Sequence, residues 1–210
     1  MKRLAILGAG GHARVVADAA EACGWPEISL FDDAWPDVTR EPWPVLGVGS
    51  DLETRLADFD GVVVAIGANA VRLHKQRRLA RLGAQIASII HPAATVSRHA
   101  ILGPGSVVFA GAVINPGAKI GDAAVINTAA TIDHDCRIGH GVHVSPGANV
   151  AGGVNIGNET WIGIGASVRE LVSIGARVRI GAGCAVIASV PDDLTVIGVP
   201  ARPLQKPDNA

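Results

Sequence analysis

A period of six residues runs through the second half of the chain and strongly limits what the chain can fold into. In steps of six from Ile90 to Val186, all seventeen positions hold Ile, Leu or Val. Two residues before each of them, from Ser88 to Cys184, no side chain is larger than valine. One large and one small inward position per hexapeptide is typical of a parallel β-helix, in which each coil buries its inner face only against its neighbours. If three hexapeptides form one triangular coil, residues one coil apart stack about 4.8 Å from each other, as neighbouring strands do.

The composition agrees with a repetitive scaffold and argues against binding of nucleic acid. The 26 glycines, 12 prolines and absent tyrosine are unusual for an ordinary globular domain. A formal net charge of −1, with 18% charged residues, provides no basic surface for nucleic acid. We therefore expect no nucleic-acid partner.

The cysteines and the first residues predict a cytoplasmic protein. Cys23, Cys136 and Cys184 are an odd set with no C-x-x-C spacing, which suits a reducing compartment. Cys136 and Cys184 fall on the small inward column, so we expect them to be packing residues. The apolar run that follows "MKR" is too short for a signal peptide or a membrane span. No membrane association is expected.

The first 88 residues have a different pattern, which predicts a small parallel α/β domain of the Rossmann-like kind. Short apolar runs alternate with helical periodicity, and Gly24 and Gly83 stand where the two helices should stop. The expected strands are residues 2–7, 28–33 and 61–67, and the expected helices are residues 14–23 and 69–83. The division into domains is thus 1–88 for the α/β domain, 89–195 for the β-helix and 196–210 for a C-terminal tail.

A glycine turn after the first expected strand is a candidate nucleotide site. Gly8, Gly10 and Ala13 match G-x-G-x-x-A, and Asp32 with Asp33 ends the second strand where an acid that binds ribose is expected. Because the domain is about half the size of a full dinucleotide fold, a mononucleotide is the favoured ligand. Two alternatives stay open: the glycines only close a tight turn, and the aspartates only form a solvated strand end.

The histidines of the stretch 127–153 are judged by their register in the repeat. His134 follows its aliphatic anchor by two residues, and His143 lies between two inward positions, so both should project away from the core. One coil away from His134 lie Pro116 and Gly152, which leaves space beside the ring. The flanking Asp133 and Asp135 favour a general base, because a carboxylate that holds one imidazole nitrogen raises the basicity of the other.

Other interpretations of these histidines remain. His134, His140 and His143 are candidate zinc ligands, but the register places them on different sides of the prism, so only a site shared across a threefold axis would serve, as in the β-helical carbonic anhydrases. Exposed histidines on a solenoid with no chemical role are a further alternative. Exposed backbone N–H groups beside a base are what acyl transfer needs, and this favours the base.

With these motifs the chain resembles the left-handed β-helix acetyltransferases that modify nucleotide-linked amino sugars, whose relatives O-acetylate sialic acids. The resemblance covers nearly the whole chain and rests on four segments: "GAGGHARVVAD", "HPAATVS", "NTAATIDHDCRIGHGVHVSPGANVAGGVNIG" and "VIGVPARPL".

The resemblance implies a homotrimer with acetyl-CoA, and no metal, in sites between neighbouring β-helices. It also implies roles for single residues. His134 is the general base, Asp135 raises its basicity where many relatives have glutamate, and Asn127 positions the reacting groups. The residues implied for acetyl-CoA are His143, Gly152, Ile164 and Ala182, and those implied for the nucleotide sugar are Gly10, Gly11, His12, Asp32, Asp33 and Gly67. A helix-start residue that faces water is the alternative for His12.

The function implied is direct transfer of acetyl from acetyl-CoA to the amine of a UDP- or GDP-linked amino sugar. O-acetylation of sialic acid or a related sugar is the nearest alternative. A zinc-dependent hydratase and a non-catalytic nucleotide-binding scaffold are less favoured. Cys136 should point inward, which argues against a cysteine nucleophile.

Overall fold

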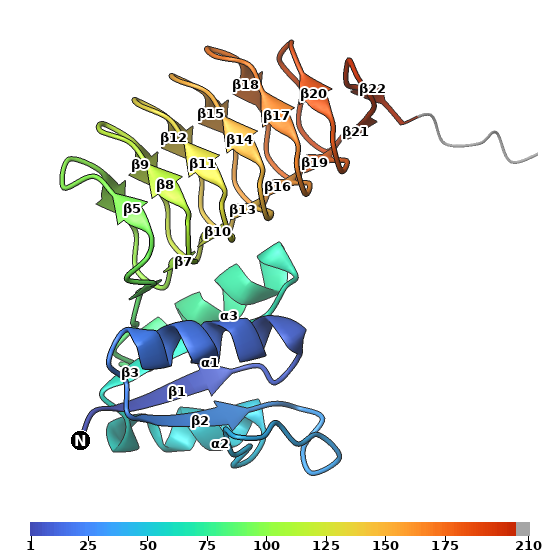
Figure 1. Cartoon of the computed structure of the whole chain (residues 1–210). Coiled ribbons are helices and arrows are strands. Elements are labelled where there is room, and N and C mark those ends of the chain that lie inside the picture. The colour runs from blue at the N-terminus through green and yellow to red at the C-terminus, as the bar shows by residue number, and fades with distance from the viewer. Residues whose placement is uncertain (205–210) are drawn as a thin grey trace, which may run out of the picture.

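The structure is a computed structural model that describes residues 1–204 of the chain. A small α/β domain lies against one side of a long solenoid, near the solenoid's first coils (Figure 1). Residues 205–210, the end of the predicted C-terminal tail, lie outside the described residues. None of the described helices is long and apolar enough to cross a membrane.

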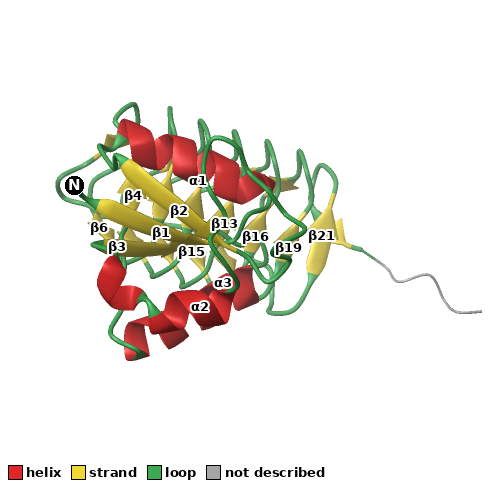
Figure 2. Ribbon diagram, turned by 90° about the horizontal axis from the view of Figure 1, so that it is seen from below, coloured by secondary structure: helices red, strands yellow, loops and turns green. Residues whose placement is uncertain are grey.

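The α/β domain is built on three parallel strands in the order β2-β1-β3. Helix α1 covers one face of this sheet, and α2 and α3 lie on the other (Figure 2). The prediction of a small parallel sheet with two helices is confirmed, while the short α2 and η1 were not expected. The elements are β1 (Arg3–Leu7), α1 (Gly11–Ala22), β2 (Glu27–Phe31), α2 (Gly49–Thr54), the 3₁₀-helix η1 (Leu56–Asp58), β3 (Gly61–Val64) and α3 (Asn69–Arg81).

Both helices end within two residues of the predicted ends, and α1 begins three residues earlier than predicted. Helix α1 ends at Ala22, and Gly24 follows with φ +83°; α3 ends at Arg81, and Gly83 follows with φ +93°. Glycine adopts this left-handed conformation without the steric penalty that a Cβ brings. The buried residues of α1 are Val16 and four alanines, and these small side chains allow the helix to pack closely between the sheet and the solenoid.

The solenoid is a triangular prism with three parallel sheets, here named faces one, two and three. Face one is β4 (Ile89–Ile90), β7 (Val107–Val108), β10 (Val125–Ile126), β13 (His143–Val144), β16 (Trp161–Ile162), β19 (Arg179–Ile180) and β21 (Thr195–Ile197), with β22 (Arg202–Pro203) added antiparallel. Face two is β5 (Thr95–Val96), β8 (Val113–Ile114), β11 (Thr131–Ile132), β14 (Asn149–Val150), β17 (Ser167–Val168) and β20 (Ala185–Val186). Face three is β6 (Ile101–Leu102), β9 (Lys119–Ile120), β12 (Arg137–Ile138), β15 (Asn155–Ile156) and β18 (Ser173–Ile174).

The predicted register of the repeat is confirmed. Every hexapeptide anchor ends a two-residue strand, and strands pair with those one coil away, as Val125 does with His143 and His143 with Trp161. The aliphatic and small columns form one continuous core from Val108 to Val196 that includes Cys136 and Cys184. Ile90, in the first coil, is 41% exposed, because no earlier coil covers it.

The α/β domain covers the beginning of face one. Ile89, Val107 and Val125 point out of the solenoid, yet each is fully buried, because they pack in one cluster with Val16 and the buried alanines of α1. Face one becomes accessible only beyond this contact. The predicted domain bounds 1–88, 89–195 and 196–210 stay predictions. The boundary between residues 195 and 196 lies within β21.

Candidate active site

His134 and Asp135 form a pair at the turn between faces two and three. The Asp135 carboxylate Oδ2 lies 2.9 Å from His134 Nδ1. Asp135 has φ +58°, a left-handed conformation that few residues other than glycine adopt. Both side chains are open to solvent, with 62% of the His134 side chain exposed. Nδ1 is thus occupied, and Nε2 is the nitrogen that can meet a substrate.

The neighbouring carboxylates make this imidazole more basic. The hydrogen bond to Asp135 raises the pKa of His134 above its usual value, and the charge of Asp133 adds to the effect. Asp133 itself accepts hydrogen bonds from the His134 backbone N–H at 2.7 Å and from Asn115 Nδ2 at 2.8 Å. Of the two flanking aspartates, Asp135 therefore orients the ring, and Asp133 holds the turn.

Two glycines leave room for the pair on the adjacent coils. A Cβ on Gly152 would lie 2.5 Å from His134 Nε2, and a Cβ on Gly117 would collide with the Asp135 carboxylate. The predicted stacking of Gly152 beside His134 is thereby confirmed. The space next to Nε2 exists only because residue 152 has no side chain.

A second group of predicted residues lines a hollow along face one. This hollow has a volume of about 490 Å³ and crosses several coils toward the C-terminal end of the solenoid. Its lining includes four predicted residues, namely Asn127, His143, Ile164 and Ala182. Trp161 and Arg179 line it too, one and two coils beyond His143 on the same face. An elongated hollow of this kind suits an extended ligand.

His143 points out of the solenoid core, as predicted, but it is covered rather than open to solvent. Only 5% of the residue is exposed. Its ring centroid lies 4.0 Å from that of Trp161 and 6.2 Å from that of His12, and its Nε2 lies 3.2 Å from Asn127 Nδ2. Burial, aided by the charge of Arg72, lowers the pKa of His143 to about 3. The imidazole is therefore neutral near pH 7, and its buried Nδ1 has no hydrogen-bond partner within the described residues.

His12 belongs to the same buried cluster. The alternative of a helix-start residue that faces water does not fit, because the ring packs edge-on against Phe109 at 5.8 Å and its Nε2 is buried without a partner among residues 1–204. Burial, with a contribution from Arg72, lowers the pKa of His12 to about 4. The start of α1 thus meets face one beside His143.

The glycines at the ends of the parallel strands are of two kinds. Gly8 has φ +121°, and a Cβ there would lie 2.7 Å from the Ala65 carbonyl oxygen, so the tight turn requires this glycine. Gly10, Gly11 and Gly67 have nothing within 4 Å of a Cβ position. Structural necessity explains Gly8 only, and the other three border open space at the ends of the parallel strands.

Asp32 and Asp33 have partners inside the domain. Asp32 accepts hydrogen bonds from the backbone N–H groups of Ala9 at 2.6 Å and Ala34 at 3.0 Å. Asp33 accepts one from Gly49 at 2.9 Å and lies 3.6 Å from Lys75 Nζ. Asp32 stabilises the glycine turn through these hydrogen bonds. The Asp33 side chain is 69% exposed, so the alternative of a solvated strand end stays open for Asp33.

Within one chain the predicted site residues fall into two groups. His134, Asp135 and Gly152 lie at the turns between faces two and three. The other residues lie along face one and the α/β domain that contacts it. These two regions are at different corners of the prism, so a single chain does not bring His134 to Asn127 and His143.

The three histidines considered for zinc do not converge in one chain. His134 lies between faces two and three, His140 between faces three and one, and His143 on face one. His140 instead lies 3.4 Å from the Asp122 carboxylate and accepts a hydrogen bond from its backbone N–H. Within residues 1–204, no group of three or more His, Cys, Asp or Glu side chains is arranged to hold a metal ion.

Four residues of these surfaces were not predicted from the sequence. Trp161 and Arg179 occupy outward positions one and two coils from His143, so the repeat contained the signal that they share its face. Asn69 and Arg72 lie three residues apart on α3 and are buried at the contact between the domains. Only the docking of the α/β domain on the solenoid explains that burial, and no local pattern predicts it.

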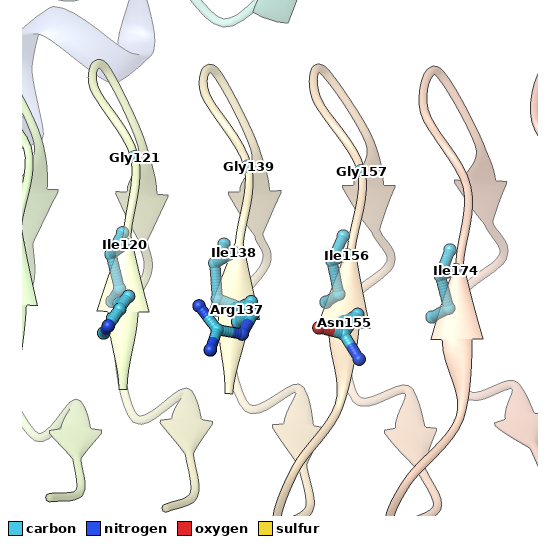
Figure 3. A pocket seen from close by; sticks show the side chains of 10 residues that line it. Ile120, Gly121, Arg137, Ile138, Gly139, Asn155, Ile156, Gly157 and Ile174 are labelled. Carbon is cyan, nitrogen blue, oxygen red and sulfur yellow. The ribbon is translucent and has the colours of Figure 1, made fainter. Parts of the chain in front are cut away.

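Another hollow, on face three, holds none of the predicted residues. It has a volume of about 530 Å³ and lies along face three, where Arg137 and Asn155 stand on successive coils (Figure 3). Gly121, Gly139 and Gly157 follow the strands there and line up along the solenoid (Figure 3). A Cβ on any of the three would meet the backbone of the next coil within 3 Å. Coil stacking therefore explains this glycine row.

Comparisons with known proteins find similarity over both domains of the chain. Residues 3–79 match the family described as the PglD N-terminal domain. The acetyltransferase domain of PglB from Neisseria gonorrhoeae FA1090, solved with acetyl coenzyme A, is 42% identical, with a TM-score of 0.93 over 97% of this chain and 99% of that one. The chain belongs to the family of left-handed β-helix N-acetyltransferases that act on nucleotide-linked amino sugars. The predicted fold class is thereby confirmed.

Two further relatives have named substrates. PerB from Caulobacter crescentus, solved with CoA and GDP-perosamine, is 38% identical, with a TM-score of 0.93 over 98% of each chain. UDP-N-acetylbacillosamine N-acetyltransferase from Bacillus subtilis (strain 168) is 37% identical over 113 residues. That match covers 52% of this chain and 52% of the relative, so this chain matches about half the length of the curated protein.

Proposed function

We propose that this chain transfers the acetyl group of acetyl-CoA to the amino group of a UDP- or GDP-linked amino sugar. The observation that carries the proposal is the His134–Asp135 pair with Gly152 beside its free nitrogen. The relatives that bind acetyl-CoA, CoA and GDP-perosamine support the choice of donor and acceptor class. The two nucleotides in the relatives' names leave both UDP and GDP as candidates.

His134 acts as the general base. Its Nδ1 is held by Asp135, so Nε2 takes a proton from the sugar amine as the amine attacks the thioester carbonyl. The amine–carbon bond forms, the carbon–sulfur bond breaks, and the protonated His134 returns its proton to the sulfur, so that CoA leaves as the thiol. No covalent enzyme intermediate is needed, and the inward position of Cys136 fits a direct transfer.

The donor lies along the hollow of face one. Ile164 and Ala182 line the path of its pantetheine arm, and His143, neutral and fixed by Trp161, contacts the thioester end. The Gly152 N–H is directed at the oxygen on which negative charge develops. Much of the rate comes from the alignment of two bound substrates.

The acceptor's nucleotide binds at the ends of the parallel strands in the α/β domain. Gly10, Gly11 and Gly67 border open space there, and the start of α1 provides backbone N–H groups for phosphate. Asp32 and Asp33 lie near the nucleoside, and His12 joins this site to His143 on face one. The sugar thus extends from the α/β domain toward the solenoid.

A homotrimer completes the site. The base and its oxyanion donor lie at one corner of the prism and the donor hollow at another, so one subunit supplies His134 to the hollow of its neighbour. Closed cyclic symmetry then makes three identical sites. We also place the enzyme in the cytoplasm, in keeping with its free cysteine thiols.

The test is release of CoA thiol with a panel of UDP-, GDP- and dTDP-linked amino sugars, with sialic acid as the hydroxyl control. We expect turnover on one UDP- or GDP-linked amino sugar, and a fall in kcat of about 10²- to 10⁴-fold in His134→Ala. Turnover on sialic acid alone would move the enzyme to O-acetylation. Equal rates for His134→Ala and the parent protein would refute the assigned base.

A further inference from the structure

One arginine of the α/β domain is fully buried against the solenoid and has no acidic partner among the described residues. Arg72, on α3, has no exposed surface. Its donors are all directed at oxygen atoms of neutral groups, and its pKa, lowered by burial, is still about 10. A charged guanidinium that is kept inside a protein needs such a full set of hydrogen bonds.

The oxygens that hold Arg72 come from both domains. From the solenoid, the Ala123 carbonyl accepts from Nε at 2.9 Å and the Gly141 carbonyl accepts from Nη2 at 2.9 Å. From the α/β domain, the Ile66 and Gly67 carbonyls accept from Nη1 at 2.9 and 3.0 Å. One planar group thus ties two turns of the solenoid to the loop after β3.

Asn69, Arg72 and Gln76 form a row of polar side chains on α3, here named the polar row. Successive turns of the helix place these side chains against successive coils of the solenoid. Gln76 Nε2 donates to the Pro104 carbonyl at 2.8 Å, Arg72 follows on the next coils, and Asn69 Nδ2 donates to the Thr160 carbonyl at 3.1 Å. The helix pitch of about 5.4 Å is close to the coil spacing of about 4.8 Å, so successive turns and coils stay in step. Gly105 and Gly141 stand opposite the row, where a Cβ would meet Gln76 and Leu73.

Within this row, Arg72 alone also contacts the loop at the substrate end of β3. The loop contains Gly67, a proposed substrate contact. Gly141, which Arg72 holds from the solenoid side, lies two residues before His143. Gln76 donates to Pro104, at the end of the solenoid's first coil, and makes no hydrogen bond to the loop.

We propose that Arg72 is a positioning residue that sets where the nucleotide-bound sugar lies relative to the acetyl-transfer site on the solenoid. The inference rests on the proposed function, because it assumes a nucleotide held by the α/β domain and an acetyl donor held by the solenoid. Arg72 touches neither substrate. It fixes the distance between the two regions that hold them.

Arg72→Lys is the decisive variant, because lysine keeps the charge but has no planar fork that reaches four carbonyls at once. We expect kcat to fall by about tenfold to a hundredfold, since small misplacements of reacting groups cost that much. Dissociation constants of UDP, GDP and CoA, measured by titration calorimetry, should stay within twofold of the parent values. Hydrogen exchange in the segment 66–68 should become faster.

Gln76→Met is the matched control, because it removes a hydrogen bond between the domains without touching the loop. We expect its kcat and the exchange of residues 66–68 to match the parent protein, even where its Tm falls as far as that of Arg72→Lys. An unchanged kcat in Arg72→Lys would overturn the proposal, and so would an equal loss of kcat in Gln76→Met. If the parent protein turned over no amino sugar, the proposed function would be refuted instead. The hydrogen exchange of residues 66–68 in Arg72→Lys would still test whether Arg72 holds the loop against the solenoid.

Discussion

At the scale of single residues, the chemistry depends on backbone conformations that the side chains alone do not suggest. Asp135 follows His134 directly, and neighbouring residues usually point apart. The left-handed φ of +58° at Asp135 brings its carboxylate back to Nδ1, and the glycine at residue 117 leaves room for it. Aspartate, although one methylene shorter than glutamate, is therefore long enough to reach the imidazole.

Asp135→Asn should separate orientation from basicity. The amide oxygen can still accept from Nδ1–H, but a neutral amide replaces the charge-assisted hydrogen bond that raises the pKa of His134. The base acts only when neutral, so a lower pKa moves the acidic limb of the kcat/KM profile to lower pH. The weaker base should also reduce kcat by about tenfold. The profile of the parent protein, measured in the same buffers, is the reference, and an acidic limb that stays in place would show that Asp135 does not set this pKa.

Gly152→Ala tests the space beside the base. The new Cβ would lie 2.5 Å from Nε2, so the ring must turn away from the substrate. We expect kcat to fall by about a hundredfold, with Tm within a degree or two of the parent value because the exposed ring can move freely. Activity would be measured by thiol release and Tm by circular dichroism. A large loss of Tm would contradict an outward-facing residue 152.

At the scale of elements, the solenoid was readable from sequence because each coil repeats the same local requirement. An aliphatic anchor and a small partner in every hexapeptide predicted every two-residue strand from β4 to β20 and their register. The α/β strands and the ends of α1 and α3 were predicted by the same local logic. Helix α2, only six residues long, has too few periodic positions to stand out.

The site was only partly predictable for a physical reason. The exposure of His134 and the space at Gly152 follow from the repeat, and the structure confirms both. The burial of His143, His12 and Arg72 arises where two domains meet, and this contact joins residues far apart in sequence. Periodicity gives the direction of a side chain but not what will cover it.

Gly139→Ala is the element-scale counterpart of the change at residue 152. Its Cβ would lie 2.7 Å from the backbone nitrogen of Asn158 on the next coil, which cannot move without separating the coils. We expect a loss of about 1–3 kcal/mol in the free energy of unfolding, measured as a lower urea midpoint. Since face three holds no proposed substrate contact, kcat at a temperature well below Tm should stay within twofold of the parent value. Parent-like stability would mean that coil stacking does not explain this glycine row.

At the scale of the whole molecule, the central claim is that one active site uses two corners of the prism from two subunits. The fold brings the α/β domain and the donor hollow together, and it leaves His134 with Asp135 on another corner. In the proposed homotrimer, a neighbouring copy related by threefold symmetry closes that gap. The account therefore predicts that defects at the two corners complement each other.

The most direct measurement is complementation between two inactive variants in mixed trimers. His134→Ala and the double change Asn127→Ala with His143→Ala would be co-expressed with different affinity tags, and trimers carrying both tags would be purified. Each trimer that carries both variants has one intact site out of three, because a site needs one variant on each side in one order, so these trimers should recover about a third of the parent's rate of thiol release. Each variant alone provides the baseline. Mixed trimers that form but stay at this baseline would contradict a site shared between subunits.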